Sequence, residues 1–129
     1  MILAVLLSLG NSTGGVRLLA AESAATAEDR ADFLRSCGWE VDITSEEEQT
    51  IHIPERFTTV YESYNELQLQ QGYNLADYAG EDCLLYSYAV VNYPDPSQTV
   101  LAHLYVYKNR IIGGDVHSTN LDGFMIGLK

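Results

Sequence analysis

Residues 83–116 read CLLYSYAVVNYPDPSQTVLAHLYVYKNRIIGGDV, and this stretch decides the fold class. Two runs rich in β-branched and aromatic residues, Cys83–Tyr93 and Thr99–Tyr107, lie on either side of a turn that contains two prolines. A third apolar run, Ile111–Val116, follows a second polar turn. Because short polar links join consecutive strands into antiparallel pairs, the stretch predicts a three-stranded antiparallel meander.

The residues before this meander predict two helices and two short strands. Apolar residues recur at helical spacing over residues 26–37 and 57–67, with a glycine downstream of each segment. Between them, Glu40–Ile43 and Thr50–Ile53 alternate polar and apolar residues around an acidic turn, which predicts a hairpin. The expected fold is therefore α+β: an antiparallel sheet, made of the early hairpin and the late three-stranded meander, with two main helices packed on one face.

The second helix also carries an expectation about which side chains form the core. Trp39, just after the first helix, and Tyr64 and Leu67 in the second are expected to be core residues. The spacing of 3.6 residues predicts that Phe57, Val60, Tyr61, Tyr64 and Leu67 face the sheet, while Glu62, Asn65, Glu66 and Gln70 point away. Gly113-Gly114 is expected to mark a bulge or a close approach of two backbones.

Composition and charge limit the classes of partner. The chain has 129 residues, 47% of them hydrophobic, which suits one domain with one core. Seven Lys and Arg against 18 Asp and Glu give a formal net charge of -11. Since nucleic acids and anionic membrane surfaces would be repelled, neither is an expected partner, and a membrane is expected only through an N-terminal anchor.

Residues 1–25 are expected to form an apolar leader, followed by a single domain over residues 26–129. The run Met1–Leu9 is apolar, but no span approaches the roughly 20 apolar residues of a membrane helix. A signal peptide cleaved near Ala25–Ala27, a truncated membrane anchor, and an amphipathic or disordered leader all fit this pattern. An apolar leader before an acidic domain favours a place outside the cytoplasm, with the leader serving export or tethering.

Candidate catalytic and metal-binding residues are few. Asp115 and His117 lie two apart in a predicted strand and so share one face, and Asp122 follows shortly after. A carboxylate and an imidazole suit a divalent metal, but catalytic zinc normally keeps three protein ligands, and the sequence predicts no third. No metal, cofactor or catalytic residue is therefore expected. His52 and His103 are each expected to make an ordinary cross-strand hydrogen bond.

The two cysteines, Cys37 and Cys83, show no spacing pattern of a disulfide framework and are expected to be free thiols. Cys83 directly follows Glu81 and Asp82, and this acidic setting should raise the pKa of its thiol. Nucleophilic catalysis by Cys83 is therefore not expected.

Tyrosine is the unusual residue type, since all nine lie between Tyr61 and Tyr107. Tyr86 and Tyr88 are spaced by two and so share a sheet face, as do Tyr105 and Tyr107. Cross-strand aromatic contacts stabilise sheets, and this alone accounts for the four residues. The functional alternative is an aromatic surface that binds a sugar ring or a peptide, and the four tyrosines are its candidate binding residues.

A resemblance to a known family rests on eight segments, namely Phe33–Val41, Ile53–Phe57, Val60–Tyr61, Tyr64–Gln68, Gly72–Leu75, Tyr78–Gly80, Ile111–Val116 and Leu121–Met125. In this order they resemble the bacterial family known as domain of unknown function 4830, over about residues 28 to 127. The resemblance implies a short protein of Gram-positive bacteria, commonly with an N-terminal membrane segment and with no assigned activity. The chain departs from the family in its short apolar leader and at Cys37, where an aromatic residue is expected.

Two functions remain open at this stage. The favoured one is a non-catalytic binding or interaction domain, exported or membrane-tethered, whose acidic surface with its tyrosines meets a protein, peptide or carbohydrate ligand. The alternative is a small metal-dependent hydrolase that uses Asp115, His117 and Asp122. Convergence of those three side chains would favour the hydrolase.

Overall fold

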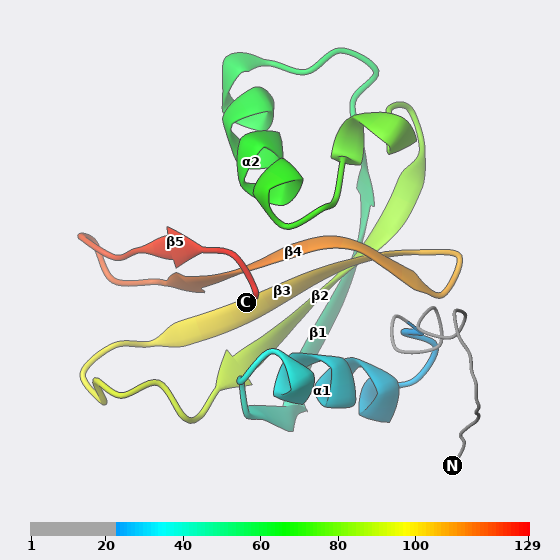
Figure 1. The fold of residues 1–129 in the computed structure, drawn as a ribbon. Coiled ribbons are helices and arrows are strands. Elements are labelled where there is room, and N and C mark those ends of the chain that lie inside the picture. Colours follow the sequence, from blue (N-terminus) through cyan, green and yellow to red (C-terminus); the bar gives the residue numbers. More distant parts are fainter. Residues whose placement is uncertain (1–22) are drawn as a thin grey trace.

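The computed structural model describes residues 23–129 (Figure 1). The five strands form one antiparallel sheet in the order β1-β2-β3-β4-β5, which confirms the predicted α+β class and the late meander. In chain order the elements are α1 (Ala27–Ser36), β1 (Val41–His52), α2 (Thr59–Gln70), the 3-10 helix η2 (Leu75–Tyr78), β2 (Asp82–Val90), β3 (Val100–Tyr107), β4 (Arg110–Ser118) and β5 (Met125–Ile126).

Both helices begin and end where side-chain chemistry requires it. Thr26 caps α1 by accepting a hydrogen bond from the Asp29 backbone N–H at 3.0 Å, and Thr58 caps α2 in the same way. Gly38 and Gly72 follow the two helices with φ angles of 99° and 90°, a left-handed conformation that glycine adopts without steric cost. The predicted ends of both helices are thus confirmed to within a few residues.

The predicted early hairpin is wrong, because β1 is one continuous strand of 12 residues. It pairs with β2 at both ends, and the register shifts between Asp42 and Glu47. The acidic run is therefore part of an irregular strand and not a turn. Two bonds hold this irregularity: the Ser45 hydroxyl accepts from the Ala89 N–H at 2.8 Å, and Glu46 turns inward to pair with Arg30 at 2.8 Å.

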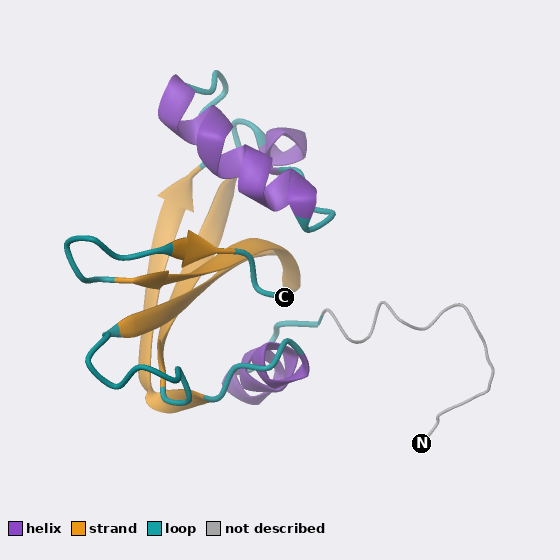
Figure 2. Ribbon diagram, turned by 60° about the vertical axis from the view of Figure 1, so that its left-hand side comes forward, coloured by secondary structure: helices purple, strands orange, loops and turns teal. Residues whose placement is uncertain are grey.

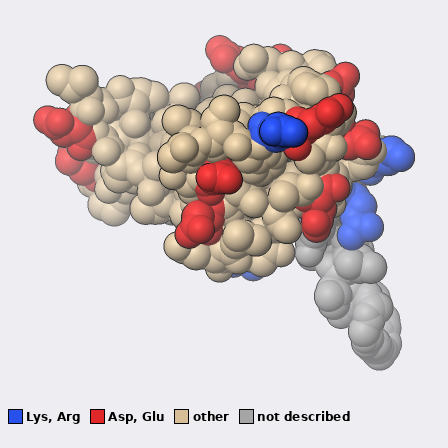
Figure 3. Space-filling model, turned by 90° about the horizontal axis from the view of Figure 1, so that it is seen from above, with Lys and Arg blue, Asp and Glu red and all other residues tan. Residues whose placement is uncertain are grey.

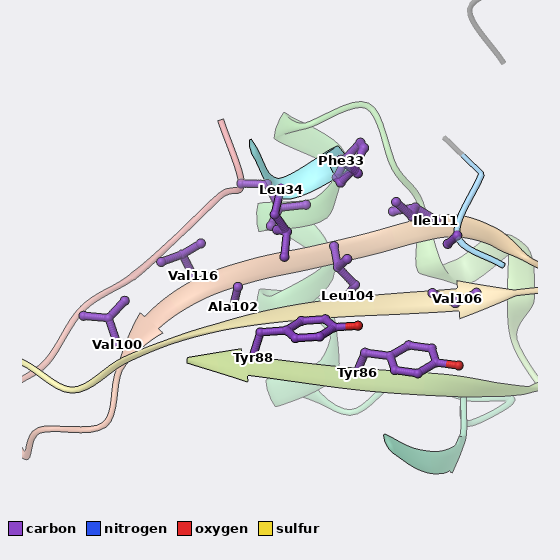
Figure 4. Packing of buried hydrophobic residues seen from close by; sticks show 12 residues of the cluster. Phe33, Leu34, Tyr86, Tyr88, Val100, Ala102, Leu104, Val106, Ile111 and Val116 are labelled. Carbon is purple, nitrogen blue, oxygen red and sulfur yellow. The ribbon is translucent and has the colours of Figure 1, made fainter. Parts of the chain in front are cut away.

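The two helices pack against opposite faces of the sheet, which corrects the expectation that both lie on one face. In Figures 1 and 2 the sheet lies between α2 and α1. Alternate residues of β3 point to opposite faces, so Leu104 meets α1 while Tyr105 meets α2. Figure 4 shows the larger core, on the α1 side, which includes Phe33, Leu34, Tyr86, Tyr88, Val100, Ala102, Leu104, Val106, Ile111 and Val116.

Helix α2 buries two polar side chains, and one of them, Asn65, was predicted to point away from the sheet. Asn65 and Gln68 are its buried residues, whereas Val60 is 78% exposed. Leu67 is half-buried and belongs to neither core cluster, while Trp39 and Tyr64 do pack against the core as expected. The amides are buried because they bond to backbone: the Asn65 carbonyl oxygen accepts from the Leu75 N–H at 2.8 Å.

Gly113-Gly114 produces both predicted features at once. The β3–β4 register shifts beside Gly113, which is a bulge, and α2 approaches the backbone there. A Cβ on Gly113 would lie 2.9 Å from the Gln68 Oε1 and 3.3 Å from the Leu75 Cδ2, so a side chain here would press on side chains of α2 and η2. The absence of a side chain at Gly113 thus leaves space for the side chain of Gln68 beside β4.

The described fold begins three residues before the predicted domain start. Ser23 forms a β-bridge with Arg110, and Ala24 is buried and donates its N–H to the Asn109 carbonyl at 2.9 Å. The rest of the predicted leader, residues 1–22, lies outside the described residues. Within residues 23–129, every helix is too short or too polar to cross a membrane.

Candidate functional site

Two histidines and an aspartate meet on the face of the sheet that α2 covers. His103 on β3 and Asp115 on β4 are direct partners in the register, and His117 lies two residues further along β4 on the same face. We call these three residues the His-Asp-His cluster. Tyr64 reaches it from α2 and donates its hydroxyl hydrogen to Asp115 Oδ2. The cluster thus joins two neighbouring strands to the helix above them.

Both imidazole rings turn a nitrogen toward the Asp115 carboxylate. His117 Nδ1 lies 2.8 Å from Asp115 Oδ1, and His103 Nδ1 lies 3.4 Å from Oδ2. The centroids of the two rings are 4.5 Å apart. Because both rings turn Nδ1 to one carboxylate, their positions depend on Asp115. The expected cross-strand hydrogen bond is confirmed for His52, which pairs with Asp82 across β1 and β2. The cross-strand contact of His103 is its 3.4 Å approach to Asp115.

Asp115 is a fully buried carboxylate that nevertheless carries its charge. Burial alone would raise the pKa of Asp115, but hydrogen bonds from His103, His117 and Tyr64 outweigh burial and lower this pKa to about 2. Burial and the neighbouring carboxylate together raise the pKa of Tyr64, so this hydroxyl remains a donor. The imidazole side chains are 23% and 17% exposed for His103 and His117. A charged, buried carboxylate therefore lies beneath two rings that solvent can reach.

The cluster has the donor set of a metal site. One nitrogen of each imidazole and one oxygen of Asp115 all lie within 4.8 Å of one another. Among residues 23–129 this is the group of His, Cys, Asp or Glu side chains that could hold an ion. Asp122 does not belong to it and lies exposed in the loop between β4 and β5. His103 is thus the third potential ligand that the sequence did not predict.

A second feature is a cleft of about 690 Å³ between the C-terminal ends of α1 and α2. Its floor is the first part of β4, and η2 and the last residues of the chain complete it. The lining residues are Phe33, Ser36, Gln70, Gln71, Gly72, Tyr73, Asn74, Asp77, Tyr78, Arg110, Ile111, Ile112, Leu128 and Lys129. Tyrosine rings, amides and one carboxylate therefore meet in the cleft, with two basic side chains beside them.

The four candidate tyrosines are divided between the two faces of the sheet. Tyr86 and Tyr88 are buried on the α1 side, where both rings lie along one side of β2 (Figure 4). Tyr105 and Tyr107 are half-buried on the α2 side, against Tyr64 and Tyr78 respectively. Each spacing-two pair thus shares a face, but the two pairs do not form a common surface. Neither pair lines the cleft.

Tyr86 and Tyr88 serve a buried arginine. The Arg30 guanidinium lies 3.6 Å from the centroid of the Tyr86 ring, and its Nε donates to the Tyr88 hydroxyl at 2.7 Å. The same guanidinium pairs with Glu46 and donates to the Ala24 carbonyl at 2.8 Å. Burial opposes the charge of Glu46, yet the bonds from Tyr88 and Arg30 lower the pKa of this carboxyl. These contacts tie α1 to β1 and β2.

Both cysteines are free thiols, as expected. Burial, and after it the charge of Asp82, raises the pKa of Cys83 to about 11, in the predicted direction. On the face seen from the α2 side, acidic side chains occur at several separate places and basic side chains at fewer (Figure 3).

These features define a small acidic α+β domain with a five-stranded antiparallel sheet, a mixed polar and aromatic cleft, and a His-Asp-His cluster on one sheet face. A family model, Domain of unknown function (DUF4830), matches residues 33–116, and the chain belongs to this family. The match covers the end of α1, all of β1, α2, β2 and β3, and β4 as far as Val116, so it includes His103 and Asp115 but not His117. Searches of the curated proteins and of the solved structures found no match.

Proposed function

We propose that this protein is a non-catalytic ligand-binding domain that acts outside the cytoplasm, and that its ligand is a carbohydrate held in the cleft. The cleft supports this best, because a volume of about 690 Å³ lies within the range of small-molecule sites, roughly 300–1,000 Å³. Tyr73 and Tyr78 offer flat apolar rings on which a sugar can stack. Gln70 and Asp77 offer the hydrogen-bonding groups that sugar hydroxyls need.

The charge around the cleft narrows the kind of carbohydrate. Arg110 and Lys129 both line the cleft, although the whole chain carries only seven Lys and Arg. Asp77 is the one carboxylate among the lining residues. A saccharide that carries a carboxylate would therefore find a complementary charge here, whereas a polycationic partner would have to bind on the acidic surface elsewhere.

The place outside the cytoplasm rests on the apolar leader, and the fold adds where that leader joins the domain. Ser23 pairs with Arg110 at the start of β4, so the chain enters the domain beside the cleft. Cell fractionation of the full-length gene product tests this part of the proposal. Recovery with the membrane or the culture medium would support export or tethering, whereas a soluble cytoplasmic protein with Met1 intact would refute it.

A titration followed by NMR tests the cleft. Uronic-acid oligosaccharides should shift the backbone amide signals of Gly72, Tyr73 and Asn74, and neutral oligosaccharides should do so more weakly. Replacing Arg110 with Ala should weaken binding at least tenfold, since a charge-assisted hydrogen bond contributes roughly 1.5–3 kcal/mol. Arg56→Ala, an exposed arginine outside the cleft, is the matched control and should bind like the wild type.

The outcomes separate the ligand classes. Short peptides that shift the same amides, with no response to any saccharide, would replace the carbohydrate with a peptide and keep the cleft. The assignment of the site would be overturned if the Arg110→Ala variant showed the same shifts of amide signals as the wild type, or if the shifted signals belonged to residues outside the cleft.

A second function, metal-dependent hydrolysis, has one observation in its favour: three potential metal ligands converge on a sheet face. The three residues are His103, Asp115 and His117, so His103 replaces Asp122 in the ligand set proposed from the sequence. This function requires that the cluster bind a metal, and that requirement can be tested by itself.

A further inference from the structure

We propose that the His-Asp-His cluster binds one divalent transition-metal ion, with zinc as the first expectation. Imidazole nitrogens and a carboxylate oxygen are donors that zinc takes in proteins. Three such ligands leave a coordination position open, which is the arrangement of a reactive rather than a purely structural site. This inference goes beyond the carbohydrate site and does not depend on the cleft, because none of the three residues lines it.

The first argument is the set of side chains that meets at Asp115. Within residues 23–129 the buried carboxylate of Asp115 contacts two imidazole rings, His117 at 2.8 Å and His103 at 3.4 Å, and the hydroxyl of Tyr64. Buried carboxylates in proteins are typically paired or coordinate a metal. Two imidazoles and one carboxylate at a single point therefore form a donor set that suits a divalent cation.

The second argument is the spacing of the donor atoms. Ligand atoms bound to zinc lie about 2.0–2.2 Å from the ion, so two of them are about 3.4 Å apart in a tetrahedral site. In the cluster the two Nδ1-to-carboxylate distances are 2.8 Å and 3.4 Å. No donor pair in the group exceeds 4.8 Å. Small rotations of two side chains would therefore suffice to close a site around an ion.

The third argument is that the fold fixes the position of Asp115 and leaves both imidazole rings accessible to solvent. The β3–β4 register places His103 directly opposite Asp115, and Tyr64 holds the carboxylate from the side of α2. Partners of this kind orient the ligands of metal sites. The rings of His103 and His117 are partly exposed, so an ion can reach them from solvent. A bound ion would take the Nδ1 of each ring in place of its present contact with the Asp115 carboxylate.

Isothermal titration of the untagged full-length chain with zinc, after treatment with a chelator, tests the proposal. One ion should bind per chain, and His103→Gln and His117→Gln should each weaken binding at least tenfold. The chain supplies a matched control in His52, which also pairs with an aspartate, at 2.7 Å, but belongs to no group of three. His52→Gln should bind zinc like the wild type.

A measurement on the wild-type protein keeps the test decisive if a variant fails to fold. The ring nitrogen resonances of His103 and His117 should shift when one equivalent of zinc is added, and those of His52 should not. Cobalt, used as a coloured substitute, should give the visible absorption of a four- or five-coordinate ion. No zinc binding, a shift confined to His52, or full binding by the double variant at positions 103 and 117 would each overturn the proposal.

Discussion

The side-chain amide of Gln68 bonds to both backbone groups of Gly114. Its Oε1 accepts from the Gly114 N–H at 2.9 Å, and its Nε2 donates to the Gly114 carbonyl at 3.0 Å. β5 pairs only with Val116 and His117, so within residues 23–129 Gly114 has no strand partner on this side of β4. The Gln68 amide makes the two hydrogen bonds that a neighbouring strand would make. Gln71 adds to them, since it also donates to the Gly114 carbonyl and accepts from the Leu128 N–H. Backbone groups of β4 that could otherwise pair with a strand of another chain are thus hydrogen-bonded by side chains from the C-terminal end of α2.

Replacing Gln68 with Ala should therefore destabilise the domain by about 2 to 4 kcal/mol, because the buried Gly114 N–H loses its partner, the Gly114 carbonyl keeps only Gln71, and a void remains. Gln70→Ala is the matched control: it makes the same change on the same helix at an exposed position, and should stay within about 0.5 kcal/mol of the wild type. Urea denaturation midpoints measure both. Equal midpoints for the two variants would show that the Gln68 bonds do not stabilise the fold.

A methyl group at Gly113 should disturb the contact between Gln68 and β4. Its Cβ would lie 2.9 Å from Gln68 Oε1 and 3.3 Å from Leu75 Cδ2. We expect Gly113→Ala to cost about 1 to 3 kcal/mol by overpacking. In the Gln68→Ala background the cost should shrink, since the main obstacle is gone, and denaturation of the double variant measures this coupling. If the losses of stability in the two single variants simply add in the double variant, the strain at Gly113 does not arise from Gln68.

Tyr64→Phe tests the support of the His-Asp-His cluster from α2. Loss of the hydroxyl removes one donor from the buried Asp115 carboxylate, so we expect a loss of about 1 to 3 kcal/mol in the free energy of unfolding. Tyr61→Phe is the control, because Tyr61 lies on the same helix and packs on Phe57 without a hydrogen bond from its hydroxyl within residues 23–129. If the two variants unfold alike, Tyr64 holds its place by packing alone.

The Glu46–Arg30 pair should make stability depend on pH. The folded state lowers the pKa of Glu46 below its ordinary value of 4.5, so its contribution is present above that pH and is lost as the pH falls through the lowered pKa. The difference in unfolding free energy between wild type and Glu46→Gln should therefore be largest near neutral pH and should shrink below about pH 4.5. Denaturant titrations across pH 2 to 7 measure it, and a difference that grows on acidification would contradict the assignment.

The matched control for that experiment is Glu47→Gln. It removes the same charge one residue along β1, from an exposed side chain, and should change stability at pH 7 by no more than about 0.5 kcal/mol. If Glu47→Gln lowered the unfolding free energy as much as Glu46→Gln does, the effect would come from net charge and not from the pairing with Arg30.

The sequence by itself determined the local elements of this protein. A run rich in β-branched and aromatic residues predicted β3, and Thr26 and Gly38 marked the ends of α1, because these signals act over a few neighbouring residues. The family resemblance over the helices and the meander was likewise readable from separated segments, and the family match confirms it. Aspartate and histidine at positions 115 and 117 were placed on one face for the same local reason.

Only the tertiary structure decided which distant residues meet. His103 lies opposite Asp115 because β4 contains one extra residue at the bulge near Gly113, and a slip of one residue would have turned one partner to the other face. Gln68 and Arg30 are buried although their types favour the surface, because each finds partners that are distant in sequence: the backbone of Gly114 for one, and Glu46, Tyr86 and Tyr88 for the other. Such burial depends on the satisfaction of every polar group in three dimensions, and no local pattern of residues encodes it.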